Sequence, residues 1–144
     1  MIIANRVKNL FTCAMLLQII FQSVYANDYA RLEQVKIYVR CEALMNTTAE
    51  VLSESEQEYL QHPLHKEALN SHIVVLELLN SGDFNEIGLG DLYLEYKTEF
   101  ENIFQKNEND PQRVRFLETL DSEIASCQGL NEMQKDIIDR TKKK

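Results

Sequence analysis

Residues 29–52, YARLEQVKIYVRCEALMNTTAEVL, decide the fold class that the sequence predicts. Side chains that suit a core recur there at three- and four-residue steps and form one stripe: Ile37, Cys41, Leu44, Thr48 and Leu52. Three further apolar residues broaden it: Leu32, Val35 and Val39. Because residues three and four apart share one face of an α-helix, we expect a helix over residues 29–52 with this stripe turned toward a core.

The pattern stays helical between residues 53 and 79, with one break. Ser53-Glu54-Ser55-Glu56 offers a capping box, in which a serine is followed three residues later by a glutamate. A helical region follows over residues 56–79, and Pro63 either divides it into two helices or kinks a single one. The apolar residues expected to face the core are Leu64, Leu69, Ile73, Leu76 and Leu79.

Breaks near residues 81–90 and 107–110 separate the helices expected in the second half. The third helix covers residues 91–106, and the fourth begins with Asp110 as its N-cap, reaches Cys127 and stops near Gly129. A last short helix starts near Asn131. The inward-facing residues expected are Leu92, Tyr96, Phe100 and Ile103 or Phe104 in the third helix, Val114, Leu117, Leu120 and Ile124 in the fourth, and Met133, Ile137 and Ile138 in the last.

The predicted fold is all-α, an antiparallel bundle of four to five helices in a single domain over residues 27–144. Glycine and proline are scarce, at 4 and 2 residues, and no stretch alternates as a strand does. Short connections favour antiparallel packing of consecutive helices.

Residues 1–26 have the three-part pattern of a secretory signal peptide. Arg6 and Lys8 give a positive start, residues 10–21 (LFTCAMLLQIIF) are mostly apolar, and Val24 and Ala26 precede the expected cleavage site. The alternative, an amphipathic first helix, is less favoured because the run is apolar all round. We expect the leader to be removed and the mature protein to be periplasmic or secreted.

The acidic balance bears on the kind of partner. The chain has 15 basic and 23 acidic residues, and loss of Arg6 and Lys8 with the leader lowers the net charge from −8 to −10. This argues against nucleic acid and anionic membrane surfaces, and no further apolar run predicts membrane insertion after cleavage. The charge favours a basic protein partner, or serves solubility alone.

Cys41 and Cys127 are the two cysteines that remain after cleavage. Since exported proteins fold where thiols oxidise, we expect one disulfide between them, linking the first and fourth helices of the mature chain. The alternative is a reactive thiol, which needs a nearby cation or a helix N-terminus to lower its pKa.

The loop at residues 81–90 (SGDFNEIGLG) is the predicted partner-binding region, together with the aspartate that follows it. Large apolar groups with a charged rim are typical of protein interfaces. The candidate residues are Asp83, Phe84, Glu86, Ile87, Leu89 and Asp91. For the apolar members themselves, Phe84, Ile87 and Leu89, the favoured expectation is that they fold back onto the end of the bundle, and an exposed contact is the alternative.

Other candidate sites are less specific. His62, His65 and His72 are spaced so that they could share a helix face and hold zinc or copper, but further ligands are missing, so we expect no metal and no cofactor. Asn46-Thr47-Thr48 is a glycosylation sequon whose use the sequence leaves open. No nucleophile motif and no distinctive carboxylate pair is present, which predicts a non-enzymatic protein.

The segment Tyr38-Val39-Arg40-Cys41-Glu42-Ala43-Leu44, with Cys127 as its late partner, resembles small helical periplasmic proteins of Gram-negative bacteria. The resemblance covers one helix and an architecture. Among these proteins are immunity proteins that block cell-wall-degrading amidase toxins, and such hydrolases tend to be basic. The resemblance implies a binding or inhibitor protein that neutralises a cell-wall-acting hydrolase. The alternative hypothesis is a periplasmic stress or chaperone-like protein.

Overall fold

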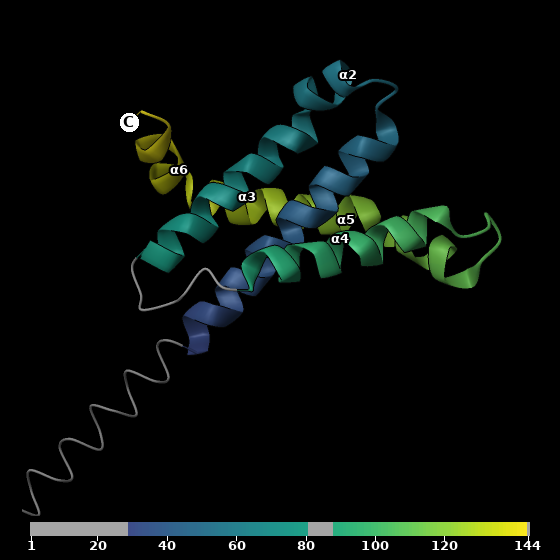
Figure 1. Cartoon of the computed structure of the whole chain (residues 1–144), viewed down its shortest axis with the longest axis horizontal. Helices are drawn as coiled ribbons and strands as arrows, with labels where there is room; N and C mark the ends of the chain where they lie inside the picture. The colour runs from purple at the N-terminus through teal and green to yellow at the C-terminus, as the bar shows by residue number, and fades with distance from the viewer. Residues whose placement is uncertain (1–28, 81–87, 144) are drawn as a thin grey trace, which may run out of the picture. The chain divides into compact units, whose positions relative to one another are not determined.

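The computed structural model describes residues 29–80 and 88–143, and every regular element in this part of the chain is an α-helix (Figure 1). The all-α prediction is confirmed. The chain divides into two units, residues 1–34 and 35–144. The described residues of the first unit, 29–34, are helical, while the predicted signal peptide lies outside the described residues.

The second unit begins with residues 35–52, which we call the N-terminal helix. Five labelled helices follow: α2 (Glu56–Gln61), α3 (Pro63–Asn80), α4 (Leu89–Gln105), α5 (Pro111–Met133) and α6 (Lys135–Lys142).

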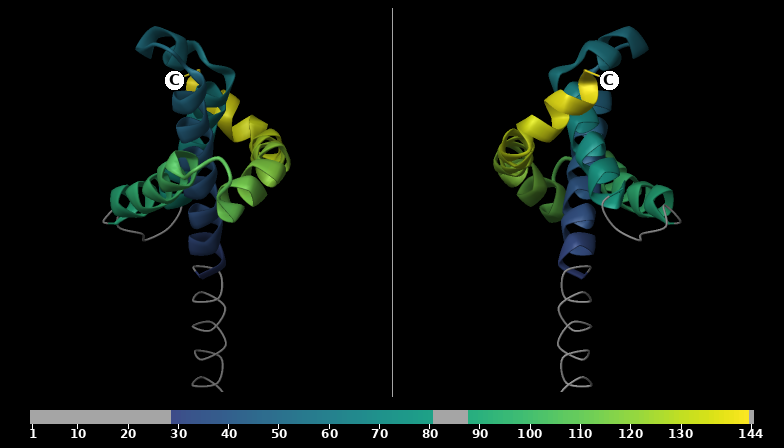
Figure 2. Two further views of the ribbon diagram at one scale, coloured as in Figure 1. Left: turned by 90° about the vertical axis from the view of Figure 1, so that its right-hand side faces the viewer. Right: turned by 90° about the vertical axis from the view of Figure 1, so that its left-hand side faces the viewer.

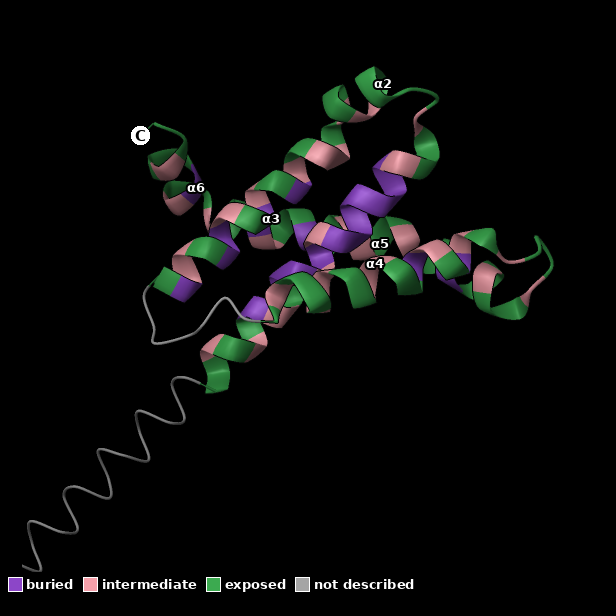
Figure 3. Ribbon diagram, viewed as in Figure 1, coloured by how far each residue is buried: buried purple, intermediate pink, exposed green. Residues whose placement is uncertain are grey.

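The middle of the N-terminal helix is buried on all sides. From Cys41 to Ala49 every residue except Glu42 is buried, whichever way its side chain points (Figure 3). A helix enclosed in this way needs apolar or small residues around its whole circumference, so the single predicted stripe was too narrow. Two members of that stripe were wrong, because Ile37 and Leu52 lie outside the enclosed stretch and are 49% and 59% exposed.

Pro63 divides the second helical region into α2 and α3, which is the first of the two predicted alternatives. Ser55 is the N-cap of α2, since its side chain accepts a hydrogen bond from the Glu58 backbone N–H. The buried face of α3 is rotated by about one residue from the prediction, and Leu69 and Leu76 are exposed. The buried residues of α3 are Ala68, Ser71, Val74, Val75 and Leu79.

Helix α5 is longer than predicted. Asp110 caps it as expected, accepting from the backbone N–H groups of Gln112 and Arg113. The helix nevertheless continues through Gly129 to Met133, and α6 starts at Lys135 instead of near Asn131. The reason is tertiary: Asn131 is buried in the last turns of α5 and bonds to α3, which outweighs the weak helix propensity of one glycine. Three residues predicted to face inward are exposed: Val114, Leu117 and Met133.

The helices form two hairpins that cross each other. The N-terminal helix and α3 make one hairpin, with α2 at its tip, and α4 and α5 make the second (Figures 1 and 2). The arms of the second hairpin lie on either side of the N-terminal helix (Figure 2) and contact each other through Phe100, Phe104 and Phe116. The consecutive helices α3 and α4 do not pack side by side, and α3 contacts α5 instead. The predicted single bundle is only approximately right.

Two clusters of buried side chains fill the space between the helices. The first cluster joins the N-terminal helix, α3, α4 and α5: Cys41, Ala43, Leu44, Met45, Ala68, Phe100, Ile103, Phe116 and Cys127. The second joins the N-terminal helix, α3 and α6: Val35, Tyr38, Val39, Val74, Val75, Leu79 and Ile138. The N-terminal helix contributes to both, so its position sets those of the other helices.

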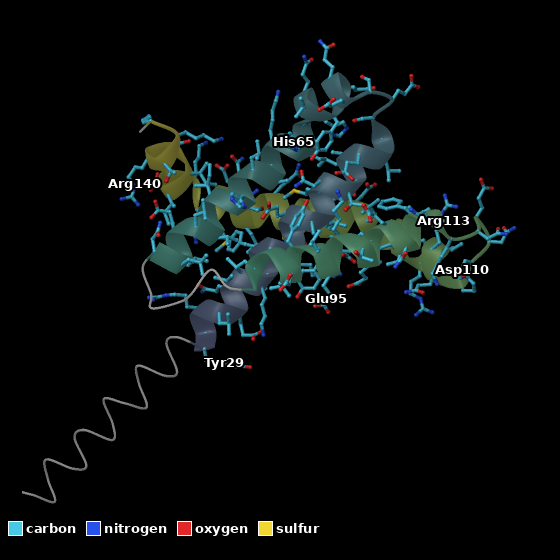
Figure 4. All side chains as sticks on the ribbon, in the orientation of Figure 1. Tyr29, His65, Glu95, Asp110, Arg113 and Arg140 are labelled. Atoms are coloured by element: carbon cyan, nitrogen blue, oxygen red, sulfur yellow. A yellow bond between two sulfur atoms is a disulfide. The ribbon has the colours of Figure 1, made fainter. Side chains whose placement is uncertain are left out.

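The predicted disulfide is confirmed. Cys41 and Cys127 are joined with an S–S distance of 2.07 Å and a Cα–Cα distance of 5.5 Å, which ties the N-terminal helix to α5 (Figure 4). Both sulfurs lie in the first core cluster. Among the described helices, none combines the length and apolar character that a bilayer span requires.

Candidate functional site

A line of polar residues runs along one side of the N-terminal helix where most of its neighbours are apolar. Glu42, Asn46 and Glu50 are spaced four residues apart and so lie on one helix face. Each bonds to side chains of other helices, and we call this set of interactions the polar seam. Its partner residues are Tyr59 in α2, His65 and His72 in α3, and Tyr93 and Lys97 in α4.

Asn46 is the centre of the polar seam and is only 7% exposed. Its Nδ2 donates to the Tyr93 hydroxyl at 3.1 Å, and its Oδ1 accepts from the Tyr59 hydroxyl at 3.2 Å. His65 Nδ1 lies 2.9 Å from the same Oδ1, and His65 also contacts the Tyr59 ring, with centroids 4.4 Å apart. Both ends of the amide are thus engaged in the interior. In this fold the sequon asparagine is enclosed and cannot carry a glycan.

Ion pairs occupy the two ends of the polar seam. His72 Nδ1 lies 3.2 Å from Glu42 Oε1, and Lys97 Nζ lies 2.7 Å from Glu50 Oε1. A weaker contact of 3.7 Å joins Lys97 to Glu101 within α4. These pairs connect the N-terminal helix to α3 and to α4, and the carboxylates balance the cations locally.

Most of the resolved pKa shifts of the described residues fall in the polar seam. The hydrogen bond to Glu42 raises the pKa of His72 against the opposing effect of burial. Burial raises the pKa values of the Tyr93 and Tyr59 hydroxyls, with a further contribution to Tyr59 from the charge of Glu50. Burial lowers the pKa of Lys97, but the hydrogen bond and charge of Glu50 outweigh it, so the pKa is raised. The raised pKa values keep the two tyrosine hydroxyls neutral and Lys97 charged. Groups with shifted pKa values that lie close together are typical of functional sites.

A pocket opens at each end of the polar seam. At one end the His72 pocket, a cavity of about 210 Å³, has the Glu42–His72 pair in its wall. Its apolar wall is formed by Val39, Val75, Leu76, Leu89 and Tyr93. At the other end the tip pocket, a shallow and open depression of about 310 Å³, lies at the tip of the first hairpin. The tip pocket is lined by Glu50, Ser53, Glu54, Ser55, Glu56 and Tyr59.

A larger cavity of about 420 Å³ lies among α3, α5 and α6. Carboxylates and lysines line it, and its one buried polar side chain, Asn131, already bonds to Ser71 Oγ and to the Glu67 carbonyl and carboxylate. Since these bonds use both ends of the amide, nothing buried is left to select a guest. The polar seam is the better candidate site.

The predicted loop site can be placed only in part. Asp83, Phe84, Glu86 and Ile87 lie outside the described residues. Leu89 is half-buried, packs against the second core cluster and lines the His72 pocket, while Asp91 is exposed in the first turn of α4. Leu89 is therefore folded back onto the helices, which is one of the two predicted alternatives, and it also forms part of a pocket wall.

The three histidines have separate partners. His62 Nδ1 accepts from the Leu64 backbone N–H, His65 bonds to Asn46 and His72 bonds to Glu42 (Figure 4 labels His65). In the part of the chain that the structure describes, no group of three histidine, cysteine or carboxylate side chains is arranged to hold a metal ion.

The sequence contains a signal for the polar seam that a search for apolar stripes misses. Glu42, Asn46 and Glu50 repeat at four-residue spacing within residues 29–52. Polar residues at helical spacing inside an enclosed helix require buried partners.

Comparison with protein-family models, with curated proteins and with solved structures returns no match for this chain.

Proposed function

We propose that this is an exported, non-enzymatic binding protein that holds a basic protein partner at the tip of its first hairpin. The observation that carries the proposal is the tip pocket. Three of its six lining residues are glutamates, Glu50, Glu54 and Glu56, and a fourth, Glu58, lies in the same turn of chain. Glu50 is already paired with Lys97, so the Glu54 and Glu56 carboxylates are the ones that suit a lysine or arginine side chain of a partner.

The surroundings of the tip pocket support a protein partner over a free cation. Val51, Leu52 and Leu60 are large apolar side chains exposed on the same hairpin tip. Apolar contacts beside a charged rim are the usual composition of a protein interface. Among the described residues Glu54 and Glu56 form no salt bridge, so both carboxylates are available to a partner.

The leader pattern and the disulfide together support an exported protein. Residues 1–26 have a signal-peptide pattern, and the Cys41–Cys127 bond is compatible with folding where thiols oxidise. The specific form of the proposal is an immunity or inhibitor protein for a basic cell-wall-acting hydrolase, as the resemblance of residues 38–44 implies. In that form the hairpin tip enters the active-site cleft of the hydrolase.

The test compares two double charge reversals. Glu54→Lys/Glu56→Lys changes the tip, and Asp136→Lys/Asp139→Lys makes the same change of net charge on α6. With a basic cell-wall amidase as the partner, we expect the tip variant to associate at least about tenfold more slowly and to lose inhibition of peptidoglycan hydrolysis. The α6 variant should keep inhibition and most of the association rate.

Salt provides the second readout. The association rate of the unmodified protein should fall steeply between about 50 mM and about 300 mM salt, because exposed charges are screened over a Debye length. No complex with any basic exported protein at low salt would overturn the proposal. Binding of many unfolded clients regardless of their charge would favour the chaperone-like alternative instead.

A further inference from the structure

The His72 pocket, at the opposite end of the polar seam from the tip, is enclosed mainly by apolar side chains. The N-terminal helix contributes Val39, α3 contributes Val75 and Leu76, and α4 contributes Leu89 and Tyr93. Gly90 also lines the pocket, and a Cβ placed there would meet no atom within 4 Å. The wall is built from three helices that the two core clusters and the ion pairs hold in place.

The volume of about 210 Å³ sets the size of a guest. An engineered apolar cavity of about 150 Å³ holds benzene, so this pocket has room for one aromatic ring with a substituent of two or three heavy atoms. Because the pocket is open on one side, a fused polycyclic ring or a long acyl chain would lie only partly within it.

One polar group in the wall selects the substituent. Glu42 accepts from His72 Nδ1, so Nε2 is the ring nitrogen left for a guest, and it carries a hydrogen to donate when the ring is protonated. The Glu42 carboxylate in the same wall disfavours an anionic substituent by charge repulsion. The matching guest therefore carries a neutral hydrogen-bond acceptor, such as a carbonyl oxygen.

We propose that the His72 pocket binds a small neutral molecule made of a single aromatic ring with a carbonyl-type acceptor, oriented by a hydrogen bond from His72. This site is separate from the tip pocket and does not depend on a basic protein partner. A protein with both pockets would hold a small molecule and a partner at opposite ends of one polar seam.

The experiment uses two probes of nearly equal size, acetophenone and ethylbenzene, which differ in the carbonyl oxygen. Each is titrated at about pH 6, where the raised pKa of His72 keeps the ring mostly protonated, into the ¹⁵N-labelled, disulfide-bonded protein, and the amide signals of Leu89, Gly90 and Tyr93 are followed by NMR. We expect both probes to shift these signals and acetophenone to bind about tenfold more tightly. The free energy of one hydrogen bond from a charged donor corresponds to a difference in affinity of about this factor. His72→Leu should lower the affinity for acetophenone to that for ethylbenzene.

A matched pair of substitutions on α3 tests the location. Leu76→Trp places a larger side chain in the pocket wall and should abolish binding of both probes. Leu69→Trp, two helical turns earlier, changes a leucine that is similarly exposed (48% against 38%) and lies outside the pocket, so it should leave binding unchanged. The proposal is overturned if neither probe shifts the three signals, or if Leu76→Trp binds like the unmodified protein. Equal affinities for the two probes would overturn the role of His72.

Discussion

The carboxylate of Glu42 and the imidazole of His72 join the N-terminal helix to α3, with Nδ1 3.2 Å from each carboxylate oxygen. The hydrogen bond raises the pKa of His72 above its ordinary value of 6.5 in the folded protein. A raised pKa means that folding favours the protonated ring. The resulting stabilisation is complete below about pH 6.5 and is lost as the pH rises through the folded-state pKa.

This relationship predicts a pH dependence of stability that His72→Gln removes. Between about pH 6 and about pH 8.5 the unmodified protein should lose about 0.5 kcal/mol relative to the variant, a value kept small because the His72 side chain is 49% exposed. Urea unfolding at the two pH values measures the difference. An NMR titration that placed the pKa of His72 at or below 6.5 would contradict the prediction.

Asn46 is predicted to be the most sensitive polar position. Asn46→Ala removes both ends of the amide and leaves the Tyr59 and Tyr93 hydroxyls without their partner in the interior, so we expect a loss of about 3 kcal/mol in the free energy of unfolding. Asn102→Ala, in the exposed part of α4, is the control and should change stability by less than about 0.5 kcal/mol. Equal effects of the two substitutions would show that Asn46 is not the structural centre of the polar seam.

Two neighbouring threonines should respond in opposite directions to the same substitution. Thr47 is 1% exposed, and its hydroxyl has no hydrogen-bond partner among the described residues. The Thr48 hydroxyl, in contrast, donates to the Leu44 carbonyl at 2.8 Å. Thr47→Val should therefore raise stability by about 1 kcal/mol, and Thr48→Val should lower it by about 1 kcal/mol. Chemical denaturation of the two variants is the measurement, and a loss of stability in Thr47→Val would refute the burial of an unpaired hydroxyl.

The disulfide should contribute a large share of stability. Its two cysteines are 86 residues apart in sequence, and closing a loop of that length contributes about 4 kcal/mol on the chain-entropy model. We expect a reductant to lower the thermal midpoint of the unmodified protein markedly. The double variant Cys41→Ala/Cys127→Ala should start at a similarly low midpoint and be insensitive to reductant. A reductant effect of equal size in the double variant would mean that the loss has another origin.

Helix positions could be predicted from the sequence because local interactions decide them. Apolar spacing predicted a helix over residues 29–52, Pro63 marked a division, and Asp110 with Pro111 marked the start of α5. The disulfide could be predicted because, of the three cysteines, only Cys41 and Cys127 lie outside the predicted signal peptide. Each of these predictions needs only neighbours in sequence or the cysteine count.

Which face of each helix is buried could not be predicted, because contacts with residues distant in sequence decide it. On α3 the buried face is displaced by one residue, from Leu69 and Leu76 to Ala68 and Val75. The smaller side chains at these positions allow the N-terminal helix to pack closely against α3. The polar seam depends on contacts of the same kind, since Asn46 and Tyr93 are 47 residues apart. Spacing along the chain identifies such polar residues but not their partners.

Glycine positions provide the last prediction, since two glycines two residues apart should tolerate alanine very differently. Gly88 precedes α4 with φ at +108°, a conformation that L-residues rarely adopt, while Gly90 lies inside the helix, where an added Cβ would meet open space. Gly88→Ala should lower the free energy of unfolding by about 1 kcal/mol, and Gly90→Ala should raise it by about 0.5–1 kcal/mol.

Gly129→Ala extends the comparison to the position where the sequence predicted the end of the fourth helix. Gly129 is instead within α5, and a Cβ there also meets nothing within 4 Å. The substitution should raise stability by about 0.5–1 kcal/mol because it removes the entropic cost of a glycine in a helix interior. Urea midpoints of the three variants measure these effects. Destabilisation by Gly129→Ala would mean that α5 ends before Asn131, and the bonds from Asn131 to α3 would then have to be reassigned.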